Sequence, residues 1–229
     1  SHAKPETLTP AEVAERKDFL RKSLKLDASS ILRTNPQLQT KLIQLLMENF
    51  DAISISDNDF GKTNLVRFRI DLKPGTEPHK ARVRPLNPMQ EADLRRQLDE
   101  WLDAKIIEPT VSSWGSALVP VRKKGTDKLR WAIDYRYLND ATIKDSFPLA
   151  LIDSNLQKLT GAKVFSTLDS AGAFHNLVVD PDCRDYTTFN SVHGQFRFVR
   201  LPFGVANGPA AYSRLVQLAL DQITPGYAM

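Results

Sequence analysis

The sequence predicts a mixed α+β fold, and three observations support this prediction. Apolar residues recur at helical spacing in several segments, and two of these segments follow capping residues with proline at the first helical position. Elsewhere apolar and charged residues alternate, which is typical of half-buried strands. Some strands come in hairpins, and antiparallel strands mixed with helices, without regular βαβ alternation, indicate the α+β class.

The bulk properties fit a globular protein that needs no disulfide and no membrane. The chain has 229 residues, enough for one large domain or two small ones, with 41% hydrophobic and 25% charged residues. Its apolar runs are far shorter than the roughly 20 residues that span a bilayer. The single cysteine, Cys183, excludes an internal disulfide and suits a reducing intracellular compartment.

The first seventy residues are predicted to form two helices and a strand. Thr9 and Glu12 can form a capping box that starts a helix running toward Leu24. A second amphipathic helix is predicted over 38–50. In Leu65–Leu72 the apolar residues alternate with charged ones, which predicts a half-buried strand. The turn-rich segment that follows is interpreted as a linker.

The rest of the chain is predicted to combine helices with hairpins. The predicted elements are a helix capped by Asn87, strands near Ser116–Lys123 and Leu129–Tyr135, a helix with apolar residues from Leu149 to Leu159, an apolar strand ending at Asp169, a hairpin over 189–198 and a helix over 207–223. The basic residues of the first hairpin are therefore expected at and beside its tip.

Asp169 is the first candidate for a catalytic, metal-binding residue. An acid at the end of a hydrophobic strand is costly unless a cation meets it, and metal is the commonest reason. One carboxylate holds a catalytic divalent ion poorly, so further acids are required. The segment 180–185 contains three aspartates, but Arg184 lies among them and no ligand geometry is implied. We expect a solvated turn there.

Basic residues gather in two places. Between Pro120 and Arg136 the sequence has six of them against two acids: Arg122, Lys123, Lys124, Lys128, Arg130 and Arg136. A second group consists of Lys80, Arg82 and Arg84. Such clustering is typical of a phosphate-binding surface, and a solvated charged face is the alternative.

Four stretches resemble, in the family's order, the reverse transcriptase of gypsy-type long-terminal-repeat retrotransposons, which is related to retroviral reverse transcriptase. They are "VRPLNPMQEADLRRQLDEWLDAKIIEPTVSSWGSALVPVRKK", "LRWAIDYRYLNDATIKDSFPL", "GAKVFSTLDSAGAFHNLVV" and "FRFVRLPFGVANGPAAYSRLV", covering about residues 82–217. One such match would be weak, whereas four in order are specific. The resemblance implies the fingers and partial palm of a right-hand polymerase, with an N-terminal helical extension.

The resemblance also implies a domain organisation. We expect a helical extension or spacer in 1–60, an upstream strand, linker and first part of the fingers in 61–146, the first part of the palm with the Asp169 strand in 147–176, the second part of the fingers in 177–207, and a palm helix in 208–229. In the family a Tyr-x-Asp-Asp hairpin with the remaining acids follows that helix. The sequence ends at Met229 without it, so we expect the full-length protein to be the enzyme and these 229 residues to be inactive.

Individual roles follow from the same resemblance. Asp169 would be catalytic and would bind the metal ions, Mg²⁺ with Mn²⁺ able to substitute, helped by the backbone carbonyl of Ser170. The residues implied in nucleotide binding are Lys123, Lys124, Arg130, Phe174 and Phe203, with Phe174 as the steric gate under the sugar. The residues implied in template and primer binding are Arg136, Asn139, Gly204 and Asn207. The alternatives are a polar turn for the lysines, scaffolding for Arg136 and Asn139, core packing for Phe174, and an ordinary turn role for Gly204.

The function that the resemblance implies is RNA-directed DNA polymerase activity, with two-metal deoxynucleotidyl transfer. The implied partners are an RNA or DNA template with its primer, dNTPs, and the remaining palm, thumb and ribonuclease H domain of a gag-pol polyprotein. The expected location is intracellular, in a cytoplasmic virus-like particle or in the nucleus. The alternative is a non-catalytic nucleic-acid-binding or structural module derived from a reverse transcriptase. An RNA-dependent RNA polymerase is disfavoured, because Phe174 would crowd a ribose 2′-hydroxyl.

Overall fold

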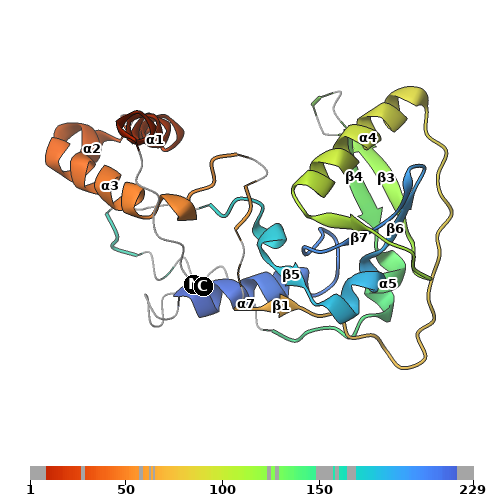
Figure 1. Ribbon diagram of the computed structural model, residues 1–229. Coiled ribbons are helices and arrows are strands. Elements are labelled where there is room, and N and C mark those ends of the chain that lie inside the picture. Colours follow the sequence, from red (N-terminus) through yellow and green to blue (C-terminus); the bar gives the residue numbers. More distant parts are fainter. Residues whose placement is uncertain are drawn as a thin grey trace. The chain divides into compact units, whose positions relative to one another are not determined.

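The computed structural model describes residues 9–26, 29–56, 59–61, 63, 65–122, 125–126, 129–147, 157, 160–163 and 169–220. The chain divides into two compact units, Ser1–Ile55 and Ser56–Met229 (Figure 1). Among the described residues, no helix is long and apolar enough to cross a membrane. The finer division into fingers and palm segments stays a prediction.

The first unit is helical in its described part. It contains α1 (Pro10–Ser23), α2 (Ser30–Thr34), α3 (Pro36–Glu48) and a 3₁₀ turn at Phe50–Ala52. Thr9 and Glu12 form the predicted capping box, and Asn35 caps α3 by accepting a hydrogen bond from Leu38 N at 3.1 Å. Phe19 packs edge-on against Phe50, with ring centroids 6.2 Å apart. The two predicted helices are thereby confirmed.

The second unit contains a five-stranded sheet and two hydrophobic cores. Its elements are β1 (Arg67–Phe68), α4 (Pro88–Asp103), β2 (Ile107–Pro109), β3 (Ser116–Arg122), β4 (Leu129–Asp134), α5 (Arg136–Ala141), η3 (Ala173–Asn176), β5 (Val178–Val179), η4 (Pro181–Thr187), β6 (Phe189–Ser191), β7 (Gly194–Phe198) and α7 (Gly208–Leu220). The predicted hairpins β3–β4 and β6–β7 are both present.

The large sheet has the strand order β2-β7-β6-β3-β4, in which only β3 and β6 run parallel. Helix α4 packs against it, as Figure 1 shows. Leu94 and Leu98 on α4 are almost fully buried and share a core with Trp131 and Phe189. The indole nitrogen of Trp131 donates to the Asp93 carboxylate at 2.9 Å, which ties the helix to β4.

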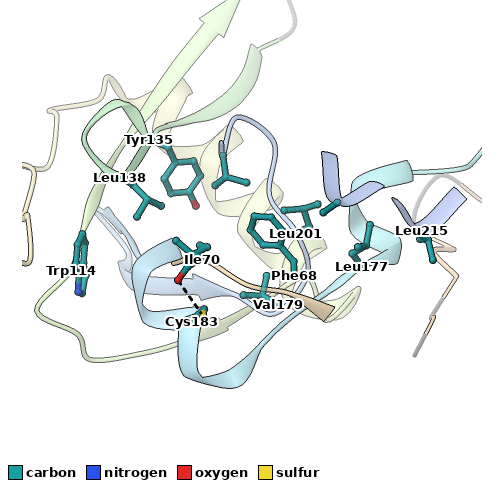
Figure 2. Packing of buried hydrophobic residues seen from close by; sticks show 12 residues of the cluster. Phe68, Ile70, Trp114, Tyr135, Leu138, Leu177, Val179, Cys183, Leu201 and Leu215 are labelled. Carbon is teal, nitrogen blue, oxygen red and sulfur yellow. Dashed lines mark hydrogen bonds between the residues drawn. The ribbon is translucent and has the colours of Figure 1, made fainter. Parts of the chain in front are cut away.

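A second core joins β1, β5, α5 and α7 (Figure 2). β1 and β5 form a parallel pair, and Phe68 and Val179 on these strands are buried. Tyr135 is fully buried beside them, and its hydroxyl donates to the Thr187 carbonyl at 2.8 Å. Burial in this apolar environment raises the pKa of the Tyr135 phenol well above its ordinary value. The hydroxyl therefore acts here as a neutral donor.

Some predicted elements differ from the structure. The strand expected over Leu65–Leu72 is limited to Arg67–Phe68, because only these two residues pair with β5. The predicted alternation is nevertheless correct, since Phe68 and Ile70 are buried. In place of the turn expected over 180–185, the structure has the 3₁₀ helix η4, which Asp180 caps and which buries Cys183. The helix expected from Leu149 to Leu159 and the strand before Asp169 lie largely outside the described residues.

Candidate nucleotide-binding site

Three of the predicted nucleotide-binding residues lie together. The rings of Phe174 and Phe203 are 5.2 Å apart at their centroids, with planes inclined by 36°. The guanidinium carbon of Arg130 lies 5.6 Å from the centroid of the Phe203 ring. Arg130 is exposed, and Phe203 is 48% exposed. The result is an open aromatic surface with a cation over it, which suits a ligand with a flat or apolar part and an anionic part.

Each residue of this surface comes from a different element. Arg130 lies on β4, where it pairs in register with Val121 of β3. Phe174 lies on η3, and its ring also meets Tyr212 of α7 edge-on, with centroids 6.0 Å apart. Phe203 lies in the loop between β7 and α7. The surface therefore exists only when the sheet, η3 and α7 are assembled together.

The loop that carries Phe203 is clamped by two asparagines. The amide nitrogen of Asn139 donates to the Gly204 carbonyl at 2.8 Å, and its oxygen accepts from Ala206 N at 2.6 Å. Asn207 donates to the Ile143 carbonyl at 2.8 Å and accepts from Asp145 N at 3.0 Å. These contacts support the scaffolding role that we considered for Asn139. Template contact by Asn139, Gly204 and Asn207 stays a prediction.

His175 packs against the Phe203 ring of the aromatic surface, and no pattern in the sequence indicated a role for it. It is 8% exposed, and its Nδ1 lies 3.1 Å from the Leu201 carbonyl oxygen. Its ring meets Phe203 edge-on, with centroids 5.2 Å apart. Burial lowers the pKa of the His175 imidazole, so the ring is neutral at neutral pH. His175 is thus a packed support and not a cation for phosphate.

Asp169 and Ser170 are exposed at the start of the turn that leads to Phe174. Asn176 fixes this turn, because its amide nitrogen donates to Ser170 Oγ at 3.1 Å and to the Ala171 carbonyl at 3.2 Å. No group of three or more His, Cys, Asp or Glu side chains lies close enough within the described residues to hold a metal ion. The described part therefore offers one carboxylate, which fits a divalent ion only together with ligands from elsewhere.

The remaining predicted site residues are placed as follows. Arg136 forms a two-point ion pair with Asp134, with nitrogen–oxygen distances of 2.8 and 2.7 Å, and its side chain is 86% exposed. This contact lowers the pKa of Asp134 below its ordinary value. Lys123 and Lys124 lie outside the described residues. The structure therefore brings together Arg130, Phe174 and Phe203, while Arg136 is paired with the neighbouring Asp134.

Two of the three aspartates in segment 180–185 form ion pairs with arginines. Asp180 pairs with Arg69 at 3.0 Å, and its second oxygen accepts a hydrogen bond from Asp182 N. Asp185 pairs with Arg197 at 2.6 Å. Two of the three carboxylates therefore neutralise arginines from other segments.

Comparison with known proteins gives a consistent picture. Residues 121–227 match the family model described as reverse transcriptase (RNA-dependent DNA polymerase). The Pol polyprotein of transposon 412 from Drosophila melanogaster is 32% identical over 206 residues, which are 87% of this chain and 17% of the polyprotein. The Pol polyprotein of transposon gypsy from the same species is 35% identical over 135 residues, which are 57% of this chain and 13% of that polyprotein.

The fold comparison agrees with the sequence comparison. The foamy viral protease-reverse transcriptase, solved in complex with an RNA/DNA hybrid, matches 97% of this chain and 29% of its own with a TM-score of 0.75 and 22% identity. The predicted α+β polymerase fold and the resemblance to retrotransposon reverse transcriptases are confirmed. This chain spans less than a fifth of the length of the transposon 412 polyprotein, since it covers 17% of it.

The clamp at Asn139 leads to the first prediction. Asn139→Ala removes the acceptor of the Ala206 amide, and a backbone N–H without a partner costs about 1–3 kcal/mol when it is buried. We therefore expect the Ala206 amide to exchange with solvent deuterium at least about tenfold faster, measured by NMR. Asn139→Asp is the matched control: it keeps the acceptor for Ala206 N and replaces the donor to the Gly204 carbonyl by a carboxylate oxygen. Unchanged exchange at Ala206 in Asn139→Ala would contradict the clamp.

Proposed function

We propose that this chain, which carries a reverse transcriptase segment of the long-terminal-repeat retrotransposon type, forms the nucleotide-facing and template-facing part of an RNA-directed DNA polymerase. The observation that carries the proposal is the convergence of Arg130, Phe174 and Phe203 beside the turn that begins at Asp169. The proposed reaction is template-directed transfer of a deoxynucleotidyl group to the 3′ end of a primer.

Arg130 is suited to bind the triphosphate. Its planar guanidinium can bind two phosphate oxygens at once, and the Phe203 ring beneath it limits the orientations available to the group. No ion pair with a carboxylate involves Arg130 in the part of the chain that the structure describes. Its charge is therefore available to an anionic ligand.

Phe174 is suited to contact the sugar. Its ring packs against the rings of both Phe203 and Tyr212, so its position is fixed by packing. A ring in a fixed position can exclude a substituent by steric clash, which discriminates more sharply than a missing attractive contact. We propose that Phe174 accepts a 2′-deoxyribose and rejects a 2′-hydroxyl.

Asp169 and the Ser170 carbonyl are the groups that would hold a divalent metal ion. We propose Mg²⁺ as the physiological ion, with Mn²⁺ able to replace it. When bound, such an ion activates the primer hydroxyl and offsets the charge of the leaving pyrophosphate. The exposed position of Asp169 at the start of the fixed turn keeps its carboxylate available for this role.

We propose a template–primer duplex as the macromolecular partner. The related foamy viral enzyme has been solved with an RNA/DNA hybrid and with double-stranded DNA. The basic hairpin offers Arg122 and Arg130, together with Lys123 and Lys124, as contacts for phosphates. Arg136 follows on α5, where a phosphate would compete with Asp134 for its guanidinium. The proposed setting of the whole protein is an intracellular gag-pol polyprotein with a complete palm, a thumb and a ribonuclease H domain.

The second prediction concerns salt dependence. If the basic hairpin neutralises about four phosphates, the logarithm of the template–primer association constant should fall against the logarithm of salt concentration with a slope of roughly −3 to −4. Replacing Lys123, Lys124 and Arg136 by alanine should flatten this slope in fluorescence-anisotropy titrations.

The matched control for this titration carries the same charge change in the first unit, through alanine at Lys17, Arg33 and Lys41. This control should bind like the unaltered chain. A slope near zero in the unaltered chain, or an equal effect of both triple variants, would show that the hairpin is only a solvated charged face.

The third prediction concerns the sugar. Phe174→Val should admit ribonucleotides and reduce the preference for dNTP over rNTP at least about tenfold, which corresponds to about 1.4 kcal/mol of differential transition-state binding. The measurement is kcat/KM for both nucleotides in a longer protein that includes the Tyr-x-Asp-Asp hairpin of the family. Phe174→Tyr, which keeps the ring, should retain the preference. An unchanged ratio with both rates reduced in Phe174→Val would mean that Phe174 only packs the core.

A further inference from the structure

A short segment far upstream of Asp169 lies directly against the turn that follows it. The ring of Phe60 meets the ring of His175 edge-on, with centroids 5.2 Å apart and planes at 70°. The same ring covers Gly172 so closely that a Cβ atom added there would lie 2.1 Å from Phe60 Cε1. Gly172 also has a positive φ of 52°, which disfavours any side chain. Phe60 therefore packs against bare backbone in the middle of the turn.

Gly61 forms a second link to the same turn. Its carbonyl accepts a hydrogen bond from Arg200 Nη1 at 2.8 Å, and the same nitrogen donates to the His175 carbonyl at 2.9 Å. A Cβ atom at Gly61 would lie 3.2 Å from the side-chain oxygen of Asn176. Asn176 is the residue that holds Ser170 and Ala171. Phe60 and Gly61 thus lie against the segment from Ser170 to Asn176 at Gly172 and at its C-terminal end, beside His175 and Asn176.

The turn needs such external support because its own residues are small. Ser170, Ala171 and Gly172 have little side-chain surface to pack, and glycine gives the backbone additional freedom. Phe60 supplies the missing packing, and through His175 it also reaches Phe203, since His175 contacts both rings. The Phe60 side chain is thereby connected both with the turn that carries Phe174 and, through His175, with Phe203.

We propose that Phe60 is a positioning residue of the nucleotide site. It fixes the backbone between Asp169 and Phe174 by packing on Gly172, and it fixes His175 under Phe203. Through these contacts it sets how sharply the site distinguishes deoxyribonucleotides from ribonucleotides. This inference rests on the proposed function, since it assigns Phe60 to the site that would bind the nucleotide.

A purely structural role makes a different prediction. Phe60 also packs against the core beneath α4, so its replacement would lower stability in either case. The quantity that separates the two roles is the ratio of the dissociation constants for ATP and dATP. A general loss of stability would change both affinities by the same factor and leave this ratio unchanged. The ratio can be measured on the full 229-residue chain with Mg²⁺, by competition against a fluorescent dATP analogue.

In this experiment Phe60→Leu should lower the ratio of the dissociation constant for ATP to that for dATP at least threefold, while the chain stays folded. Phe196→Leu is the matched control, because it makes the same change at a buried ring of β7, away from the 170–176 turn. It should lower Tm and leave the ratio unchanged. An unchanged ratio in Phe60→Leu, or an equal change in Phe196→Leu, would overturn the inference. No binding of dATP by the unaltered chain would instead overturn the assignment of the nucleotide site to Arg130, Phe174 and Phe203, and the inference with it.

A double-variant cycle tests the contact itself without any nucleotide. Gly172→Ala places a methyl group against the Phe60 ring and should lower Tm. Phe60→Ala removes the ring and should also lower Tm, but in the presence of Gly172→Ala it relieves the clash. The Tm decrease in the double variant should therefore be smaller than the sum of the two single decreases. Additive decreases would show that Phe60 does not hold the turn at Gly172.

Discussion

The backbone pairing between the segment after Phe174 and the segment before Phe203 is the constraint on which the candidate site depends. Leu201 N donates to the Leu177 carbonyl at 2.9 Å, and Val179 N donates to the Val199 carbonyl at 2.8 Å. Leu177, Val179 and Leu201 are fully buried. Hydrogen bonds in such a core are costly to break, so the register between these two segments is fixed. Phe174 and Phe203 meet because this register places them opposite each other.

The charges around the site divide into two groups. Most arginines near the second core are paired: Arg69 with Asp180, Arg197 with Asp185, and Arg214 with Asp145. These pairs connect distant segments and leave little net charge for a ligand. Arg130 packs on an aromatic ring, a contact that leaves its positive charge without compensation by a carboxylate in the described ranges. A phosphate can therefore compete for Arg130 without first breaking an ion pair.

The sequence predicted well those features that depend on neighbouring residues. Helices α1 and α4 begin at capping boxes, which are local signals, and both hairpins follow from alternation and turn residues. The extent of β1 was overestimated, because strand length depends on how far the partner strand β5 continues. Helix α5 was missed, since Tyr135 precedes it without a side-chain cap. It is short and therefore shows little helical periodicity.

The candidate site shows the same division. Family resemblance assigned Arg130, Phe174 and Phe203 to nucleotide binding, and the structure brings these three side chains together. It gave no indication of Phe60 or His175. Their roles arise from contacts across the fold, such as that between Phe60 and Gly172, which no local pattern reveals. Asn139 illustrates a further ambiguity. An asparagine can bind nucleic acid or satisfy backbone groups, and only its position beside Gly204 and Ala206 shows that the second use is present.

Photo-crosslinking with a photoreactive dATP analogue tests most directly whether this aromatic surface binds a nucleotide. The labelled chain would be digested, and the modified residues would be located by mass spectrometry. If the surface is the site, the label falls within 169–177 or 200–204, and an excess of unlabelled dNTP suppresses it. Labelling that lies elsewhere, or that unlabelled dNTP does not suppress, would contradict the assignment of Arg130, Phe174 and Phe203 to a nucleotide site.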